Sequence, residues 1–260
     1  MNRIDAKFRQ LRKDKKKAFI AFITAGYPSL EATYDLVLAF SRIGVDIIEL
    51  GVPFSDPMAD GPVIQEASQA ALRKTNIDNI LDLVSRCRRR TQVPICLMTY
   101  YNPVFCFKEA RFIRRASLAG VDGLILPDLP PEEGASLQGL AAKYNLDIIH
   151  FLSPTTAPGR IRHITKMARG FIYYVSLTGV TGERKALPAD ILKRIRQAKR
   201  STNKPVCAGF GISSRIQVEQ VQQAADGVIV GSAIVRKIRE NIGRPDLVKR
   251  VLGFVSILKG

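Results

Sequence analysis

The sequence predicts an α/β fold, a single-domain (β/α)8 TIM barrel with an extra N-terminal helix, across residues 1–260. Its length of 260 residues suits one closed barrel, which typically needs roughly 250 residues. Short apolar runs alternate with segments in which apolar residues recur at helical spacing. No break in composition indicates a linker or a second domain. An open, doubly wound sheet is the alternative, because the spacing of the runs does not show whether the sheet closes.

The apolar runs are the predicted strands: residues 19–23, 47–50, 95–98, 124–126, 148–152, 172–175, 206–208 and 228–230. Between them, the polar residues Ser29 and Ser213 predict helix caps, and Pro131 with the glutamates after it predicts another helix start. Gly44 and Gly120 stand where helices should end.

Two segments predict helices outside this regular alternation. Residues 2–13 predict a helix that covers the floor of the barrel. The interval between the second and third strands is the longest, and it predicts an additional helix over residues 62–73.

The formal charge of +17 would permit binding to nucleic acid or to an acidic surface. The Lys and Arg residues are spread along helix-like segments, however, without the interleaved aromatic residues that stack bases. We interpret them as solvated helix faces and expect no nucleic-acid partner. A basic field would still attract a small anionic substrate.

Cysteine and histidine usage predicts no metal site. The four cysteines form no CxxC pair, and Cys96 and Cys207 lie in apolar runs, which is typical of reduced, packed thiols. His150 and His163 stand far from any second metal-ligand pattern, so we expect packed or surface histidines. No apolar run approaches the roughly 18 residues of a membrane helix, and the N-terminus has no convincing cleavage site. We therefore expect a cytoplasmic protein with no membrane partner.

In a barrel of this kind the chemistry sits at the carboxyl ends of the strands. Polar, Gly and Pro residues follow the predicted strands there: residues 24–28, 51–62, 99–103, 127–131, 176–182, 209–213 and 231–232. One rim of the barrel is therefore the predicted site.

Glu49 is the first candidate for catalysis. Strand alternation places it with Ile47 on one face of a strand that should be buried on both faces. A buried carboxylate is costly unless it is paired or used, and a lone Glu is more often held by a structural hydrogen bond. The loop that follows is rich in Asp and stiffened by proline, which favours a catalytic strand end.

Asp60, in that loop, could face the same substrate from another side, as general acid/base catalysis requires. Asp56 competes for this role, but its position between Ser55 and Pro57 predicts a loop-stabilising Asx turn.

Glycines gather after the last three strands: Gly179, Gly182, Gly209, Gly211 and Gly231. Gly-rich turns that lead into helices expose backbone N–H groups, and helix N-termini favour anions. The loops after strands seven and eight are the usual phosphate site of such barrels. We therefore predict a phosphate site, with Ser232 supplying a hydroxyl at a helix start.

Residues 48–65, IELGVPFSDPMADGPVIQ, resemble the signature of the tryptophan synthase α chain family. The resemblance continues in order through residues 22–28, 98–104, 127–130, 179–182 and 209–213. It implies a barrel lyase that cleaves indole-3-glycerol phosphate to indole and glyceraldehyde 3-phosphate, at the end of tryptophan biosynthesis. It also implies a β-chain partner in an α2β2 complex. Pyridoxal phosphate is expected in that partner, and no cofactor or metal in this chain.

By this resemblance Glu49 does the acid/base work, and Asp60 lies near the indole N–H, where it stabilises the positive charge on the ring. Tyr173 would orient Glu49. The implied walls of the indole pocket are Phe22, Met98, Tyr100, Ile125 and Phe210, and the implied phosphate ligands are Gly182, Gly211 and Ser232. Residues 177–186 are expected to form a mobile lid in which Thr181 covers the pocket.

The alternatives are a standalone indole-glycerol phosphate lyase that releases free indole, and a weakly active α chain that mainly activates its β partner. The presence of both Glu49 and Asp60 argues against a loss of chemistry.

Overall fold

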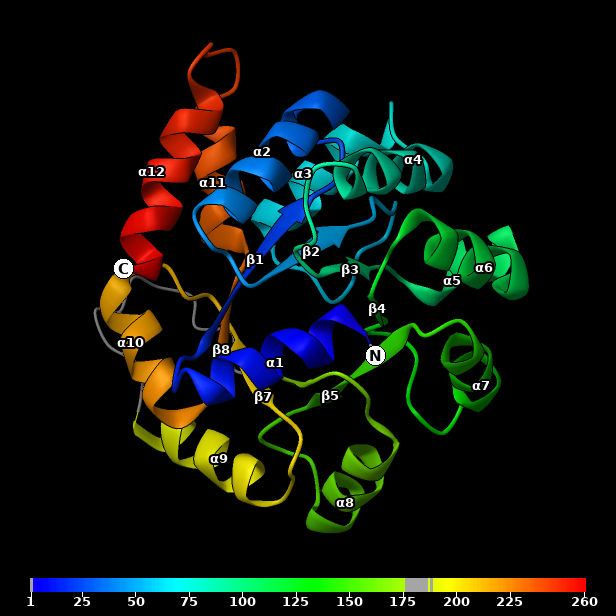
Figure 1. Ribbon diagram of the computed structural model, residues 1–260, viewed down its shortest axis with the longest axis vertical. Helices are drawn as coiled ribbons and strands as arrows, with labels where there is room; N and C mark the ends of the chain where they lie inside the picture. The colour runs from blue at the N-terminus through cyan, green and yellow to red at the C-terminus, as the bar shows by residue number, and fades with distance from the viewer. Residues whose placement is uncertain (1, 176–186, 188) are drawn as a thin grey trace.

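The eight strands form one closed parallel barrel in which each strand pairs with the next and β8 pairs with β1 (Figure 1). The computed structural model describes residues 2–175, 187 and 189–260. The strands are β1 (Ala18–Thr24), β2 (Ile47–Gly51), β3 (Ile95–Met98), β4 (Gly123–Ile125), β5 (Asp147–Leu152), β6 (Ile172–Val175), β7 (Val206–Gly209) and β8 (Gly227–Val230). Each predicted strand is confirmed, and closure of the sheet rules out the open alternative.

The helices surround the barrel, with helix pairs after β2, β3 and β8 (Figure 1). They are α1 (Arg3–Lys13), α2 (Leu30–Arg42), α3 (Pro62–Leu72), α4 (Ile77–Arg88), α5 (Tyr101–Phe107), α6 (Glu109–Ala119), α7 (Ala135–Lys143), α8 (Pro158–Met167), α9 (Ala189–Arg200), α10 (Arg215–Ala224), α11 (Ser232–Arg239) and α12 (Leu247–Lys259). The predicted extra helices before β1 and after β2 are both present, as α1 and α3.

Helix α1 closes the amino-terminal end of the barrel, and it lies across that opening in Figure 1. Its apolar side chains Ile4, Phe8 and Leu11 are buried together with lumen residues of the strands. The ring centroids of Phe8 and Phe171 are 5.8 Å apart. The Asn2 side chain accepts from the N–H of Ile4 and donates to a main-chain carbonyl, Asp122 O, at 2.7 Å, which caps the helix and ties it to the barrel. The predicted floor is confirmed.

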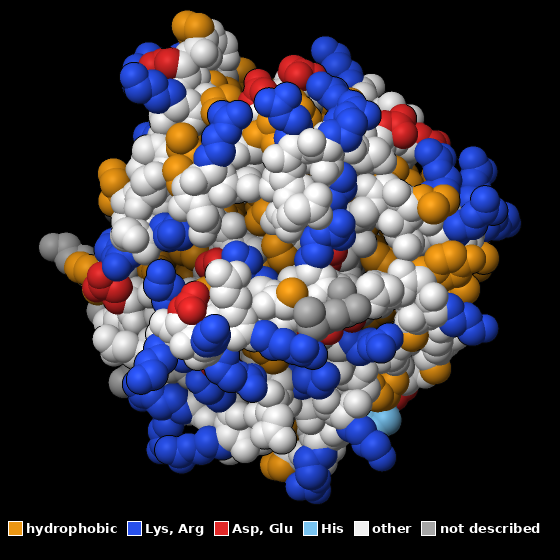
Figure 2. All heavy atoms as spheres, viewed as in Figure 1, with side chains coloured by type: hydrophobic (Ala, Val, Ile, Leu, Met, Phe, Trp, Pro, Cys, Tyr) orange, Lys and Arg blue, Asp and Glu red, His pale blue; other side chains and the backbone are white. Residues whose placement is uncertain are grey.

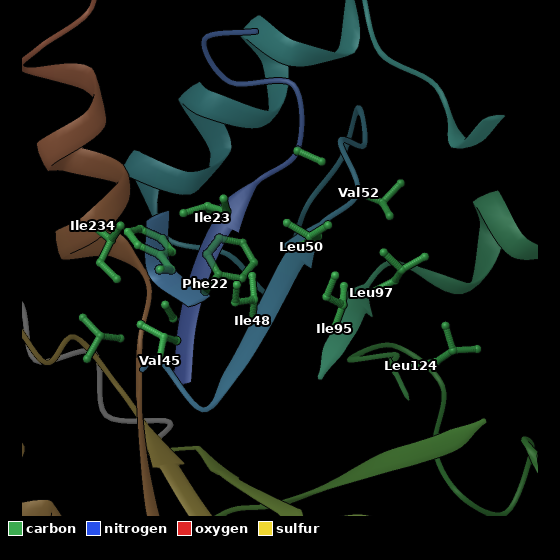
Figure 3. Packing of buried hydrophobic residues seen from close by; sticks show 14 of the residues in the cluster. Phe22, Ile23, Val45, Ile48, Leu50, Val52, Ile95, Leu97, Leu124 and Ile234 are labelled. Carbon is green, nitrogen blue, oxygen red and sulfur yellow. The ribbon is translucent and has the colours of Figure 1, made fainter. Parts of the chain in front are cut away.

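The strands bury both faces, as parallel strands inside a ring of helices must. Ile48 and Leu50 point outward into the layer between sheet and helices, together with side chains of β1 and β3 (Figure 3). Ile47 points into the lumen, where it packs with Ile20 and Cys96. The alternation that placed Glu49 on the lumen face is therefore confirmed.

Two of the predicted helix starts are wrong. The cap of α10 (Arg215–Ala224) is Ser214, whose side chain accepts from the N–H of Gln217, and Ser213 lies one residue before this cap. The turn that begins at Pro131 ends before α7, and the helix starts at Ala135. The cap at Ser29 and the left-handed glycines that follow α2 and α6 are confirmed.

Most basic side chains lie on the molecular surface, as Figure 2 shows for the face that carries α1. Arg88 is an exception to the predicted solvated faces. Its guanidinium donates to the carbonyls of Val93 and Gly120 and pairs with Asp122 at 2.6 Å, so it ties α4 to the barrel. None of the described helices is long and apolar enough to cross a bilayer.

Candidate active site

Glu49 is fully buried on the lumen face of β2, near its carboxyl end. Neither of its carboxylate oxygens has a hydrogen-bond partner among the described residues. Burial therefore raises the pKa of Glu49 to about 8, because no donor compensates for the lost hydration of the charged form. This contradicts the structural interpretation of Glu49, which requires a hydrogen bond. At neutral pH the side chain holds a proton that it can donate.

The neighbours of Glu49 include an aromatic side chain on the adjacent strand. Phe22 lies opposite Glu49 on β1 in the strand register. The pKa of Tyr173 is raised by burial and then by the charges of Glu49 and Asp60, which places the phenol within electrostatic range of both carboxylates. The rings of Phe151 and Tyr173 are 5.0 Å apart. The orientation of Glu49 by Tyr173 stays a prediction.

Asp60 is held above the barrel by Tyr100. The Tyr100 hydroxyl donates to Asp60 Oδ2 at 3.1 Å and accepts from the N–H of Ala59 at 2.9 Å. The ring of Tyr100 stacks on Phe54 with a centroid separation of 5.2 Å. Burial raises the pKa of Asp60 to about 6, and the hydrogen bond from Tyr100 opposes that shift. Asp60 is therefore mostly ionised at neutral pH.

The loop between Glu49 and Asp60 is anchored by side chains of α3. The hydroxyl of Ser68 bonds both the N–H and the carbonyl of Phe54. Gln65 and Gln69 donate to the carbonyls of Asp60 and Ser55. The expected Asx turn at position 56 is wrong, because the Asp56 side chain is exposed and accepts no hydrogen bond from a described residue, and the N–H of Met58 donates instead to the main-chain carbonyl of Asp56 at 2.9 Å.

Sequence reasoning missed these anchors. In each, a helix side chain forms a hydrogen bond with a main-chain carbonyl or N–H of the preceding loop, and no local sequence pattern predicts such a contact. The one available signal was the placement of polar residues at positions 65, 68 and 69 of a helix that directly follows the loop.

Phe22 spans the mouth of the barrel between two strand ends. An added Cβ on Gly51 would lie 2.6 Å from the Phe22 ring, and one on Gly231 would lie 3.3 Å from it. The Phe22 ring therefore fits at this position because neither glycine has a side chain. Met98 pairs with Gly51 and with Ile125 in the register, which brings these predicted pocket residues to the same end of the lumen.

The remaining predicted pocket residues follow the same rim. Tyr173 lies against the end of β7, where its hydroxyl is 2.9 Å from the position of a Cβ on Gly209. Phe210 follows that glycine and is partly buried against the core.

Two of the predicted phosphate ligands, Gly211 and Ser232, lie among the described residues, the first shortly before α10 and the second at the start of α11. Gly211 has φ +63° and open space where a side chain would lie, a conformation that favours glycine. Ser232 is the first residue of α11, so the free N–H groups of that helix start at the rim. The other predicted residues of this group, Thr181 and Gly182, lie outside the described residues, as does the proposed lid over residues 177–186.

The two carboxyl groups differ in protonation. Glu49 with pKa about 8 is an acid at neutral pH, and Asp60 with pKa about 6 is an anion. A pair of titratable groups whose environments separate their charge states can divide acid and electrostatic roles. The mouth of the barrel therefore combines a proton donor, a fixed negative charge, an aromatic wall and a helix start that suits an anion.

The role of Tyr100 gives a first prediction. The hydrogen bond from Tyr100 orients Asp60 and lowers the pKa of its carboxyl group, and Tyr100→Phe removes it. We therefore expect kcat/KM of the reaction at this site to fall about tenfold, the equivalent of one charge-assisted hydrogen bond. The apparent pKa of the acid limb of the pH profile should rise. Tyr101→Phe is the matched control, because its hydroxyl bonds Glu109 at 2.8 Å, away from both carboxylates. Equal losses in the two variants would contradict the positioning role.

Comparison with known proteins agrees with this geometry. The profile of the family described as tryptophan synthase alpha chain matches residues 8–255. The tryptophan synthase alpha chain of Geobacter sulfurreducens is 49% identical over 260 residues, which cover 100% of this chain and 98% of the relative. That of Caldanaerobacter subterraneus is 46% identical over 260 residues, with 100% and 99% coverage.

Solved structures give the same result. Tryptophan synthase subunit alpha from Legionella pneumophila superposes with a TM-score of 0.93 at 37% identity, covering 100% of this chain and 97% of that chain. A tryptophan synthase alpha-subunit from Pyrococcus furiosus gives a TM-score of 0.85 at 35% identity, with coverage of 94% and 98%. Sequence and fold agree over essentially the whole length, and the chain belongs to the tryptophan synthase alpha chain family.

Proposed function

We propose that this chain cleaves indole-3-glycerol phosphate to indole and glyceraldehyde 3-phosphate by a retro-aldol reaction, with Glu49 as the acid and base. The observation that carries this assignment is the buried, unpartnered carboxyl of Glu49 at a strand end of the barrel mouth. Residues 1–260 act in it as one domain.

The reaction needs two proton movements. A proton must reach C3 of the indole ring, and the hydroxyl on the adjacent side-chain carbon must lose one as the carbon–carbon bond breaks. Protonated Glu49 supplies the first proton and, as the carboxylate left behind, accepts the second. The carboxyl group is therefore protonated again at the end of the cycle, and its raised pKa suits both steps.

Asp60 stabilises the ring during this cycle. Protonation at C3 places positive charge on the indole nitrogen, and an ionised carboxylate beside the N–H offsets that charge. The low-dielectric surroundings that raise the pKa of Asp60 also strengthen this interaction. The phosphate group is assigned to Gly182, Gly211 and Ser232, supported by the open space at Gly211 and the start of α11 at Ser232.

Family membership implies a β-chain partner. We propose an α2β2 complex in the cytoplasm, in which pyridoxal phosphate belongs to the β chain and this chain works without a cofactor of its own. The loop between Glu49 and Asp60 is the proposed contact, because Met58 in that loop is 78% exposed while α3 holds the loop main chain.

The charge states predict a bell-shaped pH profile. The active form has Asp60 ionised and Glu49 protonated, so kcat/KM should rise with pH through about 6 and fall through about 8. The phosphate of the substrate also titrates near about 6. Asp60→Asn separates the two contributions, because it should remove the protein part of the acid limb and leave the alkaline limb in place. An alkaline limb absent up to pH about 9.5 would contradict the role of Glu49.

The test of the function is a steady-state assay of indole-3-glycerol phosphate cleavage, run with increasing β chain. We expect turnover by the free chain and a higher kcat in the complex, because a partner touching the loop aligns Glu49 and Asp60 together. Unchanged kcat in a complex confirmed by gel filtration would contradict this coupling. Little cleavage with or without the β chain, together with a higher activity of the β chain in the complex, would instead favour an α chain that mainly activates its partner.

A further inference from the structure

A cavity lies on the amino-terminal face of the barrel, opposite the catalytic rim. It has a volume of about 210 Å³, and its lining includes Arg12, Lys15, Lys16 and Lys17 with the apolar groups of α1. Figure 2 shows Lys and Arg side chains gathered around the end of α1 and over α9. The volume is far above the roughly 10–15 Å³ that one water molecule requires, so the cavity has room for a hydrated polyatomic ion.

The lining contains one carboxylate, Asp226, and it is already engaged. Asp226 Oδ1 binds Lys199 Nζ at 2.6 Å and lies 3.6 Å from Lys17 Nζ. Its other oxygen accepts from the N–H of Val206 at 3.1 Å. Two ammonium groups therefore share one negative charge.

The other three cations have no counter-charge. Arg12, Lys15 and Lys16 form no ion pair or side-chain hydrogen bond with any described residue, and Asp14 of the same turn does not line the cavity. The pKa of Lys17 is lowered, first by burial and then by the charge of Lys199, the other ammonium group beside Asp226.

Helix dipoles do not remove this imbalance. The C-terminal ends of α1 and α9 both lie here, and each contributes roughly half a negative charge. The four cationic side chains that line the cavity, against Asp226 alone, leave a larger positive excess than two helix ends can offset. An anion bound in the cavity would offset this positive excess, so the cluster gains stability from it.

We propose that this cavity binds a small oligophosphate anion, such as inorganic diphosphate, between Arg12, Lys15 and Lys16. A planar guanidinium can bind a phosphate group through two parallel hydrogen bonds, while lysines provide point charges. An anion with several charges matches several unpaired cations better than a single carboxylate does. The concave shape and limited volume fit a small ion better than a polymer. The site is separate from the mouth of the barrel, so its occupation does not block the proposed reaction.

The test is a calorimetric titration of the full chain with inorganic diphosphate at constant ionic strength. Saturating indole-propanol phosphate occupies the catalytic site, so the heat of the titration comes only from diphosphate that binds elsewhere. We expect saturable binding to the wild type and a dissociation constant about tenfold or more weaker in Arg12→Gln/Lys16→Gln, since two charge-assisted contacts are lost. Arg114→Gln/Lys249→Gln is the matched control, because both residues are exposed and lie on α6 and α12. It removes the same charge and should stay within about threefold of wild type.

Melting curves without the ion check the fold of each variant. Removing two crowded cations should maintain or raise the melting temperature of Arg12→Gln/Lys16→Gln, and Lys16→Arg should retain binding. Absence of saturable binding, or equal weakening in both double variants, would overturn the proposal. Binding to vesicles of anionic phospholipid but not to diphosphate would also overturn it, because the anion would then belong to a lipid surface.

Discussion

Glu49→Gln should lower the turnover of indole-3-glycerol phosphate by about 10² to 10⁴-fold, the usual loss when a general acid and base is removed. The amide has nearly the same shape as the protonated carboxyl but cannot deliver and recover a proton. The barrel should stay folded, and the affinity for indole-propanol phosphate should change little. Steady-state kinetics with a parallel binding titration measures both. A variant within about threefold of wild type in kcat would remove Glu49 from the mechanism.

The same variant should change how stability depends on pH. The pKa of Glu49 rises from an ordinary 4.5 to about 8 in the folded state. Between these values the folded chain binds up to one more proton at Glu49 than the unfolded chain does, so the contribution of Glu49 to stability should fall as pH rises from 4.5 to about 8. Glutamine does not titrate, so the Glu49→Gln variant should lack this contribution. Melting temperatures at several pH values in that window would show it.

Asp60→Asn should lower kcat by about 10² to 10³-fold, comparable to the loss of one preorganised electrostatic group. A neutral amide can still accept the indole N–H, but it does not offset the positive charge that forms on the ring. Asp56→Asn is the matched control in the same loop, since that side chain is exposed and bonds no described residue. A larger loss in Asp56→Asn than in Asp60→Asn would show that the roles of the two aspartates are reversed.

The strands could be predicted because parallel strands that are buried on both faces have nearly continuous apolar sequences. The exception in such a run, Glu49, was visible for the same reason. A polar residue within a run of buried positions has no inexpensive structural role, and the structure confirms that Glu49 has no partner among the described residues.

Other features had no comparable signal. Helix α5 was not predicted, and it includes Pro103 in its first turn, where proline is tolerated. The choice between Ser213 and Ser214 as a cap depends on one residue of backbone geometry. The anchoring of the Asp60 loop by Ser68 depends on tertiary packing, which brings a helix side chain under a loop that precedes it.

Side chains of the strands pack the lumen of the barrel, and α1 covers its amino-terminal end. Ile4, Phe8 and Leu11 fill its lower end, so neither water nor a ligand can pass through it. A molecule with one apolar end and one charged end can then enter in one orientation only, because the apolar end loses its water readily and the charged end does not. Closure of the amino-terminal end by α1 therefore fixes the orientation of a substrate at the catalytic rim, and both products must leave through that same rim.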